Sequence, residues 1–383
     1  MQLGHFDDEK REYVITDPHT PVKWINYIGT LAFGGFVDHT GGALICRGDP
    51  TFNRITKYIQ QMPSSEFKGE TLYLRICKPD GWQVFSPFYV PTLDPYQRYE
   101  CHVGLGYTRI ISEFYGLRTE VTIFVPMGEA REIRDIRITN ISDNPLEVDA
   151  IPVAEYTHPD ALKQFTNADW VPQTMQSKAV GDGEMLILLQ YPFMLRDIRV
   201  NYVTSNLPVS SFDSDRARFL GNYEYGTWAS PLSLKQAELN NSEALRGDNV
   251  AALMHHLGTL EPGETRRLIC QLGQEANLEA ARPGIEKYRD PENVTAAFEA
   301  MSHYWSAYLS KLQVHTPDAA MDSMLNVHHP HQCYITKMWS RYLSYYQLGL
   351  GSRGIGMRDS SQDVLAVLPF IPQEGKEFIR LLL

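Results

Sequence analysis

A chain of 383 residues, 43% of them hydrophobic and 21% charged, is long enough for more than one domain and too apolar for a disordered protein. Acidic residues outnumber basic residues by 46 to 35, and the basic residues are scattered, which argues against a nucleic-acid partner. Five widely spaced cysteines predict neither disulfides nor a zinc site. The lack of an apolar leader, or of a run of about 18 apolar residues, predicts a cytoplasmic protein without a membrane partner.

The first 275 residues have the pattern of β-strands. Short apolar stretches, many with a period of two, are separated by clusters of Gly, Pro, Asn and Asp, as at residues 121–125. Residues 136–148 predict an antiparallel hairpin around turn residues at 142–145, and the Pro-Gly turn at 260–265 predicts a second pair of strands. Repeated over this length, the pattern predicts a large antiparallel β-sandwich.

The remaining residues have the pattern of helices. Asp290 followed by a proline predicts a helix start, because apolar residues then recur at spacings of three and four as far as Leu312. A second helical stretch, at 318–348, is expected to break into two parts at Pro330. The chain ends on EFIRLLL within an apolar helical pattern, so we expect it to be truncated. Strands followed by helices predict two segregated domains.

The densest cluster of polar residues is GLGSRGIGMRDSSQD at residues 349–363. It formally contains G-x-G-x-x-G, but the residues before it have helical spacing, whereas a dinucleotide-binding loop follows a strand. One alternative is that the glycines let the backbone approach a sugar while the polar side chains hold its hydroxyl groups. The other is a network of ion pairs that ties helix ends together. The pattern leaves both open for Arg353, Arg358, Asp359, Gln362 and Asp363.

A cluster of histidines lies at residues 328–333, HHPHQC, and histidine is a common metal ligand. A proline between the histidines breaks the regular spacing of ligands on one helix face, and no second cluster completes a coordination shell. We therefore predict no metal, and interpret His328, His329, His331 and Cys333 as a surface or subunit contact. Motifs for a serine nucleophile or a phosphate-binding loop are also absent from the sequence.

Five stretches in order along the chain resemble family 94 of the glycoside hydrolases, the cellobiose phosphorylase family. They are the opening segment at 4–29, GLGYTRI at 104–110, IFVPMGE at 123–129, ITNISDNP at 138–145 and RGIGMRDSSQD at 353–363. The resemblance implies a multidomain β + α fold with a β-sandwich at 1–275, a helical linker at 276–315 and the beginning of a truncated (α/α)6 catalytic barrel at 316–383. It also implies a homodimer.

The reaction that the resemblance implies is inverting phosphorolysis of a β-linked glucoside disaccharide, of the cellobiose or laminaribiose type, to α-glucose 1-phosphate and a free sugar. Inorganic phosphate is the co-substrate, and no cofactor is expected. By the same resemblance, Arg353 and Asp359 bind the glucosyl unit and Arg341 binds phosphate, while Arg358, Gln362 and Asp363 support the loop. The general acid is expected beyond Leu383, so the chain alone is expected to be inactive.

Two other functions remain open at this point. A β-glucan hydrolase or synthase could share the same domain architecture, and its reaction would not depend on phosphate. A non-catalytic β-sandwich that binds carbohydrate or contacts another subunit is the second alternative.

Overall fold

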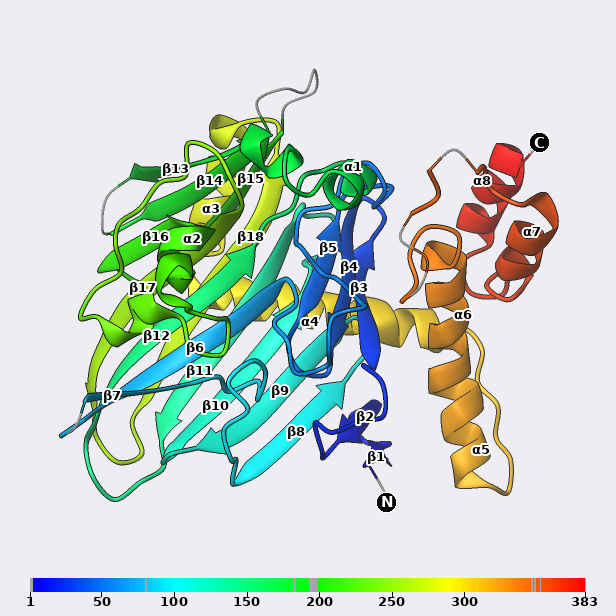
Figure 1. The fold of residues 1–383 in the computed structure, drawn as a ribbon. Helices are drawn as coiled ribbons and strands as arrows, with labels where there is room; N and C mark the ends of the chain where they lie inside the picture. Colours follow the sequence, from blue (N-terminus) through cyan, green and yellow to red (C-terminus); the bar gives the residue numbers. More distant parts are fainter. Residues whose placement is uncertain are drawn as a thin grey trace.

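In the computed structural model of this chain, two large antiparallel sheets pack face to face (Figure 1). The structure describes residues 3–79, 81–181, 184–192, 199–345, 347, 349–351 and 353–382. The first sheet has ten strands, in the order β1 (Gly4–Asp7), β2 (Glu12–Ile15), β8 (Arg98–Val103), β9 (Tyr107–Phe114), β10 (Leu117–Phe124), β11 (Arg131–Asn140), β18 (Thr265–Glu275), β15 (Val200–Ser205), β14 (Leu186–Pro192) and β13 (Met175–Gly181).

The opposing layer contains a five-stranded sheet, and a smaller three-stranded sheet lies beside it. The five strands run in the order β16 (Ser211–Asp215), β17 (Asn249–Leu260), β12 (Leu146–Glu155), β6 (Glu70–Lys78) and β7 (Gly81–Phe85). The three are β3 (Ile25–Thr30), β4 (Phe33–Asp38) and β5 (Ala43–Cys46). The main core lies between the layers, where Ile136 and Ile138 of β11 belong to the same buried cluster as Val148 and Leu253 of the opposing sheet. The predicted large antiparallel β-sandwich is confirmed.

The predicted antiparallel hairpin at residues 136–148 is wrong in its pairing, although its strands and turn are present, whereas the two strands predicted around the Pro-Gly turn at 260–265 are confirmed as β17 and β18. β11 pairs with β10 and β18, whereas β12 pairs with β6 and β17 in the other sheet. The chain between residues 140 and 146 therefore crosses from one layer to the other, and the Pro-Gly turn between β17 and β18 crosses back. Turn residues reverse the chain in either case. Which sheet the next strand joins is decided by partners far away in sequence, which a local pattern does not contain.

Among the described residues, two short helices lie in connections between strands, and the other helices follow the last strand, β18. The helices are α1 (Ala161–Thr166), α2 (Arg216–Leu220), α3 (Leu278–Lys287), α4 (Pro291–Leu309), α5 (Ala319–Ser323), α6 (His329–Trp339), α7 (Met357–Leu365) and α8 (Pro372–Leu382), with 3-10 turns η1 (Val171–Thr174), η2 (Asn222–Glu224) and η3 (Leu232–Lys235). The predicted start of α4 is confirmed, because the Asp290 carboxylate accepts a hydrogen bond from the Glu292 backbone N–H. Figure 1 shows α4, in yellow, running behind the sheets toward α5–α8 at one end of the molecule.

A single helical path runs through Pro330, where a break was predicted. A π-helical turn, η4 (Met324–His328), joins α5 to α6, and Pro330 lies in the first turn of α6. Pro330 has no N–H to donate to the preceding turn, and the π turn directly before it shifts the hydrogen-bond register at that point, so the path continues. The predicted interruption is therefore wrong.

No helix among the described residues is long and apolar enough to cross a membrane. The five cysteines, all of them in described segments, are free thiols. The domain boundaries at residues 275 and 315, and the (α/α)6 barrel, stay predictions.

Asn140 links the two connections that cross between the sheets, the one from β11 to β12 and the one from β17 to β18. Replacing Asn140 tests this arrangement. Its fully buried side chain donates to the carbonyl oxygens of Asn144 and Leu260, both at 2.8 Å, and accepts from the Ser142 N–H at 2.9 Å. Asn140→Ala leaves these groups unpaired, so we expect it to lower the free energy of unfolding by about 3 kcal/mol in urea denaturation. The control Thr139→Ala removes an exposed hydroxyl pair nearby and should change it by less than about 0.5 kcal/mol. Equal effects would contradict the account.

Candidate functional site

The polar residues predicted from the glycine-rich segment gather between the end of α6 and the start of α7. Arg341 follows α6, and its Nε lies 2.9 Å from Oδ2 of Asp363 while its Nη1 lies 3.2 Å from Oδ2 of Asp359. Asp359 and Asp363 are four residues apart on α7, so one guanidinium group contacts both carboxylates on the same face of the helix. The Ser340 hydroxyl also donates to Asp363, at 2.9 Å. The structure brings three of the six predicted residues into one cluster.

The other three predicted residues lie around this cluster. Arg358 contacts Oδ1 of Asp359 at 3.2 Å and is otherwise exposed, and Gln362 is exposed on α7. Arg353 does not contact Asp359. Its guanidinium group donates to the backbone carbonyl oxygens of Gly349, at 2.6 Å, and Leu350, at 3.3 Å.

The cluster has the chemistry for an anionic or hydroxyl-bearing ligand. The Asp359 side chain is 43% exposed, and a carboxylate offers about four lone-pair sites, so Asp359 can accept further hydrogen bonds from solvent-borne groups. Within the part of the chain that the structure describes, Nη2 of Arg341 has no hydrogen-bond partner. An ion-pair network is therefore present, and it leaves both an acceptor and a donor available. The binding roles of all six residues stay predictions.

Asp49 of the β-sandwich holds the glycine-rich loop, and the sequence analysis missed it. Its carboxylate accepts hydrogen bonds from the backbone N–H groups of Leu350, at 3.0 Å, and Gly351, at 2.8 Å. About 300 residues separate Asp49 from this loop. The only local signal is a turn-forming Asp-Pro pair, which gives no indication of the partner.

An aromatic contact fixes the helices to the sandwich near the same place. Tyr27 of β3 stacks on Trp339 of α6 with ring centroids 5.6 Å apart, and the Tyr27 hydroxyl donates to the Leu343 carbonyl at 2.9 Å. Burial raises the pKa of Tyr27 to about 12. Phe36 and Tyr58 of the sandwich belong to the same buried cluster as Trp339. The loop thus emerges from a packed interface between sandwich and helices.

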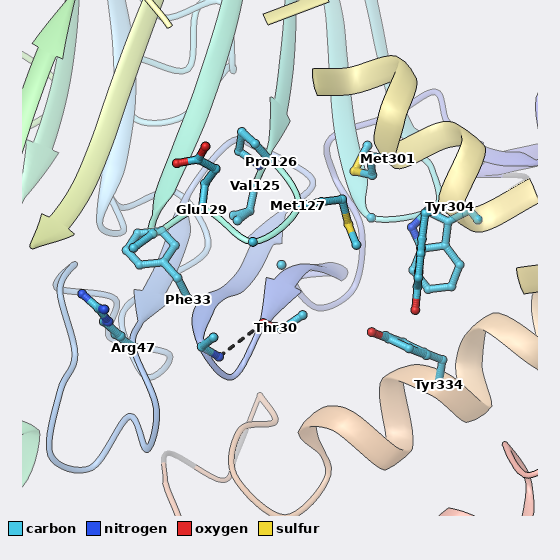
Figure 2. Close-up of a pocket in the computed structure, with 16 residues that line it drawn as sticks. Thr30, Phe33, Arg47, Val125, Pro126, Met127, Glu129, Met301, Tyr304 and Tyr334 are labelled. Carbon is cyan, nitrogen blue, oxygen red and sulfur yellow. Dashed lines mark hydrogen bonds between the residues drawn. The ribbon is translucent and has the colours of Figure 1, made fainter. Parts of the chain in front are cut away.

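Two cavities adjoin this interface. One of about 680 Å³ lies on the sandwich side, and Asp49, Phe52 and Gln274 are among its lining residues. A second, of about 140 Å³, lies where the sandwich meets α4 and α6; in Figure 2 the hydroxyl ends of Tyr304 and Tyr334 point toward one another there. Ligand pockets typically enclose about 300–1,000 Å³, and the volume of the larger cavity beside Asp49 falls within that range.

The predicted histidine cluster does not converge on one point. The His328 ring packs against Phe6 and the His331 ring against Trp305, each with centroids 4.8 Å apart, while His329 is exposed. Among the described residues, no group of three or more His, Cys, Asp or Glu side chains is arranged to hold a metal ion. His328 and His331 thus pack against Phe6 of the sandwich and Trp305 of α4, and a role of this region in a subunit contact stays a prediction.

Comparison with known proteins accounts for both halves of this arrangement. The family description "Glycosyl hydrolase 94, supersandwich domain" matches residues 11–291, and "Glycosyl hydrolase 94 superfamily, catalytic domain" matches residues 304–383. The chain belongs to glycosyl hydrolase family 94. The glycine-rich loop and its acidic cluster therefore lie in the part of this family 94 chain that matches the catalytic domain.

Relatives with named activities support the same assignment. The chain is 32% identical over 374 residues to an N,N'-diacetylchitobiose phosphorylase of Vibrio proteolyticus, covering 96% of this chain and 45% of the relative. It is 26% identical over 387 residues to a solabiose phosphorylase of Paenibacillus borealis, covering 99% and 47%. It is also 26% identical over 372 residues to a cyclic beta-(1,2)-glucan synthase of Rhizobium meliloti, covering 96% and 12%. The family 94 chain thus spans about half the length of the phosphorylases it matches.

His331 gives the interface of this family 94 chain a predicted pH dependence. Burial, with a smaller contribution from His328, lowers its pKa from 6.5 to about 4. Its Nε2 is buried and has no hydrogen-bond partner among the described residues. Because the folded pKa lies below the unfolded value, the unfolded chain takes up the proton first on acidification. His331 therefore contributes a loss of stability as pH falls from about 6.5 toward 4, of about 2 kcal/mol between pH 7 and pH 5.

Urea denaturation at pH 7 and pH 5 checks this prediction. His331→Gln should remove about 2 kcal/mol of the pH-dependent loss, because glutamine does not titrate. The exposed neighbour provides the control, since His329→Gln should keep the loss. If both variants lose stability on acidification as the parent does, His331 is not the group responsible.

Proposed function

We propose that the protein to which this chain belongs catalyses reversible phosphorolysis of a β-linked disaccharide. The observation that carries the proposal is the contact of Arg341 with both Asp359 and Asp363 beside the glycine-rich loop, in a chain whose relatives include disaccharide phosphorylases. A guanidinium group with an unpaired Nη2 suits a phosphate oxyanion, and an exposed carboxylate suits sugar hydroxyls. Both ligands of a phosphorylase thus have a counterpart in one cluster.

The chemistry of the proposed reaction needs no metal or organic cofactor. A phosphate oxygen attacks the anomeric carbon from the face opposite the glycosidic bond. The bond from that carbon to the glycosidic oxygen breaks, and a carboxylic acid supplies the proton that the leaving oxygen takes. Phosphate is already an anion, so the attacking group does not require a general base. Inversion at the anomeric carbon gives an α-sugar 1-phosphate and a free sugar.

We assign the roles of the chain's own residues on the same basis. Asp359 accepts hydrogen bonds from hydroxyl groups of the transferred sugar, and Arg353 donates to them. The free Nη2 of Arg341 binds phosphate. Arg358, Gln362 and Asp363 support these three, since Arg358 contacts Asp359 and Asp363 contacts Arg341. The general acid belongs, in this proposal, to a segment after Leu383, so the 383-residue chain alone would not turn over substrate.

The identity of the disaccharide is the finer part of the proposal. Sequence resemblance favoured a glucoside such as cellobiose or laminaribiose. Two relatives at 32% and 31% identity are named for N,N'-diacetylchitobiose, and one at 24% is named for a 3-O-beta-glucopyranosyl glucuronide. We therefore place N,N'-diacetylchitobiose beside cellobiose and laminaribiose as the substrates to test first.

A second candidate function has support in one relative. The likeness to a cyclic beta-(1,2)-glucan synthase extends over 96% of this chain, so a glucan-synthesising protein could contain the same two regions. A non-catalytic carbohydrate-binding sandwich is the other alternative. We favour the phosphorylase because the relatives at the highest identities are phosphorylases.

Three further features belong to this proposal. We propose that residues 316–383 begin an (α/α)6 barrel, that the protein is a homodimer and that it acts in the cytoplasm. The resemblance supports the first two, and the composition of the sequence supports the third.

An assay for phosphate dependence tests the proposed function. The protein encoded by the complete reading frame, including any residues after Leu383, is incubated with each disaccharide with and without inorganic phosphate. We expect sugar 1-phosphate to form only when phosphate is present. Asp359→Asn and Arg353→Ala should each lower kcat/KM by about 100-fold, because each removes a charge-assisted hydrogen bond to the sugar.

A matched substitution separates a site effect from a general loss of charge. Arg246 is an exposed arginine in the segment before β17 and is not one of the six predicted site residues, so Arg246→Ala should keep the activity of the parent. Sugar release that is unchanged without phosphate would exclude a phosphorylase and favour a hydrolase. Transfer from a nucleotide sugar would favour the synthase.

A further inference from the structure

We propose that Asp49, a residue of the β-sandwich, is a positioning residue for the sugar site. Its carboxylate fixes the glycine-rich loop in the conformation that presents Arg353. The inference rests on the proposed function, because it assigns a role to Asp49 in the same reaction. It extends that function, because it makes a sandwich residue determine how tightly the site on the helical side holds its sugar.

Asp49 contacts the glycine-rich loop through both of its carboxylate oxygens. Oδ1 of Asp49 accepts the N–H of Leu350 at 3.0 Å, and Oδ2 accepts the N–H of Gly351 at 2.8 Å. Hydrogen bonds from backbone N–H groups to an ionised carboxylate are stronger than those to a neutral acceptor. Two successive N–H groups on the two oxygens of one carboxylate also fix the direction of the loop, whereas a single bond would leave it free to rotate.

Asp49 is itself held in place by hydrogen bonds within its own turn. Its Oδ1 also accepts the N–H of Thr51 at 2.9 Å, and its backbone carbonyl accepts the N–H groups of Phe52 and Asn53, both at 3.0 Å. The Thr51 carbonyl in turn accepts the N–H of Ala161 at 3.1 Å. The turn that carries Asp49 is therefore tied to the sandwich on both sides, and its carboxylate forms a fixed platform for the loop.

The glycine-rich loop and the Asp49 turn approach each other closely at Gly349. Gly349 has a φ of +130°, a conformation that side-chain-bearing residues rarely adopt. A Cβ atom at this position would lie 1.7 Å from Oγ1 of Thr51 and 2.6 Å from Oδ1 of Asp49. The loop can dock on the Asp49 turn only because residue 349 is glycine. This gives the first glycine of the segment a structural purpose that does not involve a nucleotide.

The docked loop supports Arg353, one of the residues predicted to bind the sugar. The guanidinium group of Arg353 donates to the carbonyl oxygens of Gly349 and Leu350, the residues that the Asp49 turn holds. On the other side of the loop, the Gln347 side chain donates to the Arg341 backbone carbonyl at 2.5 Å. Loss of the Asp49 contact would therefore release the support of Arg353 first, while the ion pairs of Arg341 with α7 would remain.

Asp49→Asn tests the inference, because the amide replaces one acceptor oxygen with a donor that faces a backbone N–H. In the protein from the complete reading frame we expect KM for the disaccharide to rise by about 10-fold, with KM for phosphate changed by less than about 2-fold. Hydrogen exchange of a peptide covering residues 347–355 should become about 10-fold faster at the Leu350 and Gly351 amides. Gly349→Ala disrupts the same contact from the loop, so it should also raise KM for the disaccharide and speed exchange of the Leu350 and Gly351 amides.

Asp215 supplies the matched control. It also accepts two backbone N–H groups with its carboxylate, from Ala217 and Arg218, but it caps a helix within the sandwich. Asp215→Asn should weaken that cap without changing either KM or the exchange of residues 347–355.

The possible outcomes are distinguishable. Faster exchange with an unchanged KM for the disaccharide would overturn the positioning role, and unchanged exchange in both Asp49→Asn and Gly349→Ala would overturn the contact. If the parent protein forms no sugar phosphate from any substrate, the proposed function fails. The exchange experiment then still decides whether Asp49 holds the loop.

Discussion

The rest of the structure depends on one apolar interface, in which aromatic side chains of the sandwich and of the helices form a single core. Phe36 and Tyr58 come from the sandwich, and Trp305, Trp339 and Phe370 come from the helical region, yet all five belong to the same buried cluster. Large aromatic side chains lose much exposed apolar surface on burial and favour edge-to-face or offset contacts. The helices are therefore held against the sandwich by core packing, as elements of one domain are.

None of the residues predicted to bind sugar or phosphate lies in the sandwich, yet this interface lets the sandwich position them. The chain leaves α6 at Trp339, whose ring stacks on Tyr27, and reaches Arg341 two residues later. The glycine-rich loop then returns to the sandwich at Asp49 before α7 carries Asp359 and Asp363 back to Arg341. Packing thus fixes one end of the segment and hydrogen bonds fix its middle. The polar cluster is placed by the sandwich as much as by the helices.

Those parts of the fold that depend on local patterns could be predicted from the sequence. The alternation of apolar residues identified the strands, and the Asp290–Pro291 pair identified the start of α4 correctly. Pairing could not be predicted in the same way, because the turns after β11 and β17 look alike whether the next strand joins the same sheet or the opposite one. The predicted helix break at Pro330 was wrong for a related reason. A π turn lies directly before this proline and keeps the helical path continuous, and the sequence pattern gave no indication of that turn.

The candidate site likewise contains residues that the sequence could identify and residues whose role depends on contacts distant in sequence. Asp359 and Asp363 stood out in the sequence because they lie in one dense polar segment, and their binding and supporting roles, like the inclusion of Arg341, came from the family resemblance. That both carboxylates lie on one face of α7 and contact the same guanidinium group appears only in the folded chain. Asp49 could not be found, because its partners lie about 300 residues away and a turn-forming Asp-Pro pair is common. Gly349 stood out in the sequence, but its reason, the close approach of Thr51, appears only in the folded chain.

The most direct test of the shared core is hydrogen exchange at increasing urea concentrations, followed separately for peptides of β4 and of α6. If Phe36 and Trp339 belong to one cooperative unit, both peptides should lose protection at the same urea concentration. Loss of protection in α6 at a clearly lower concentration, with β4 still protected, would show that the helices unfold independently. The sandwich would then not be what places the site.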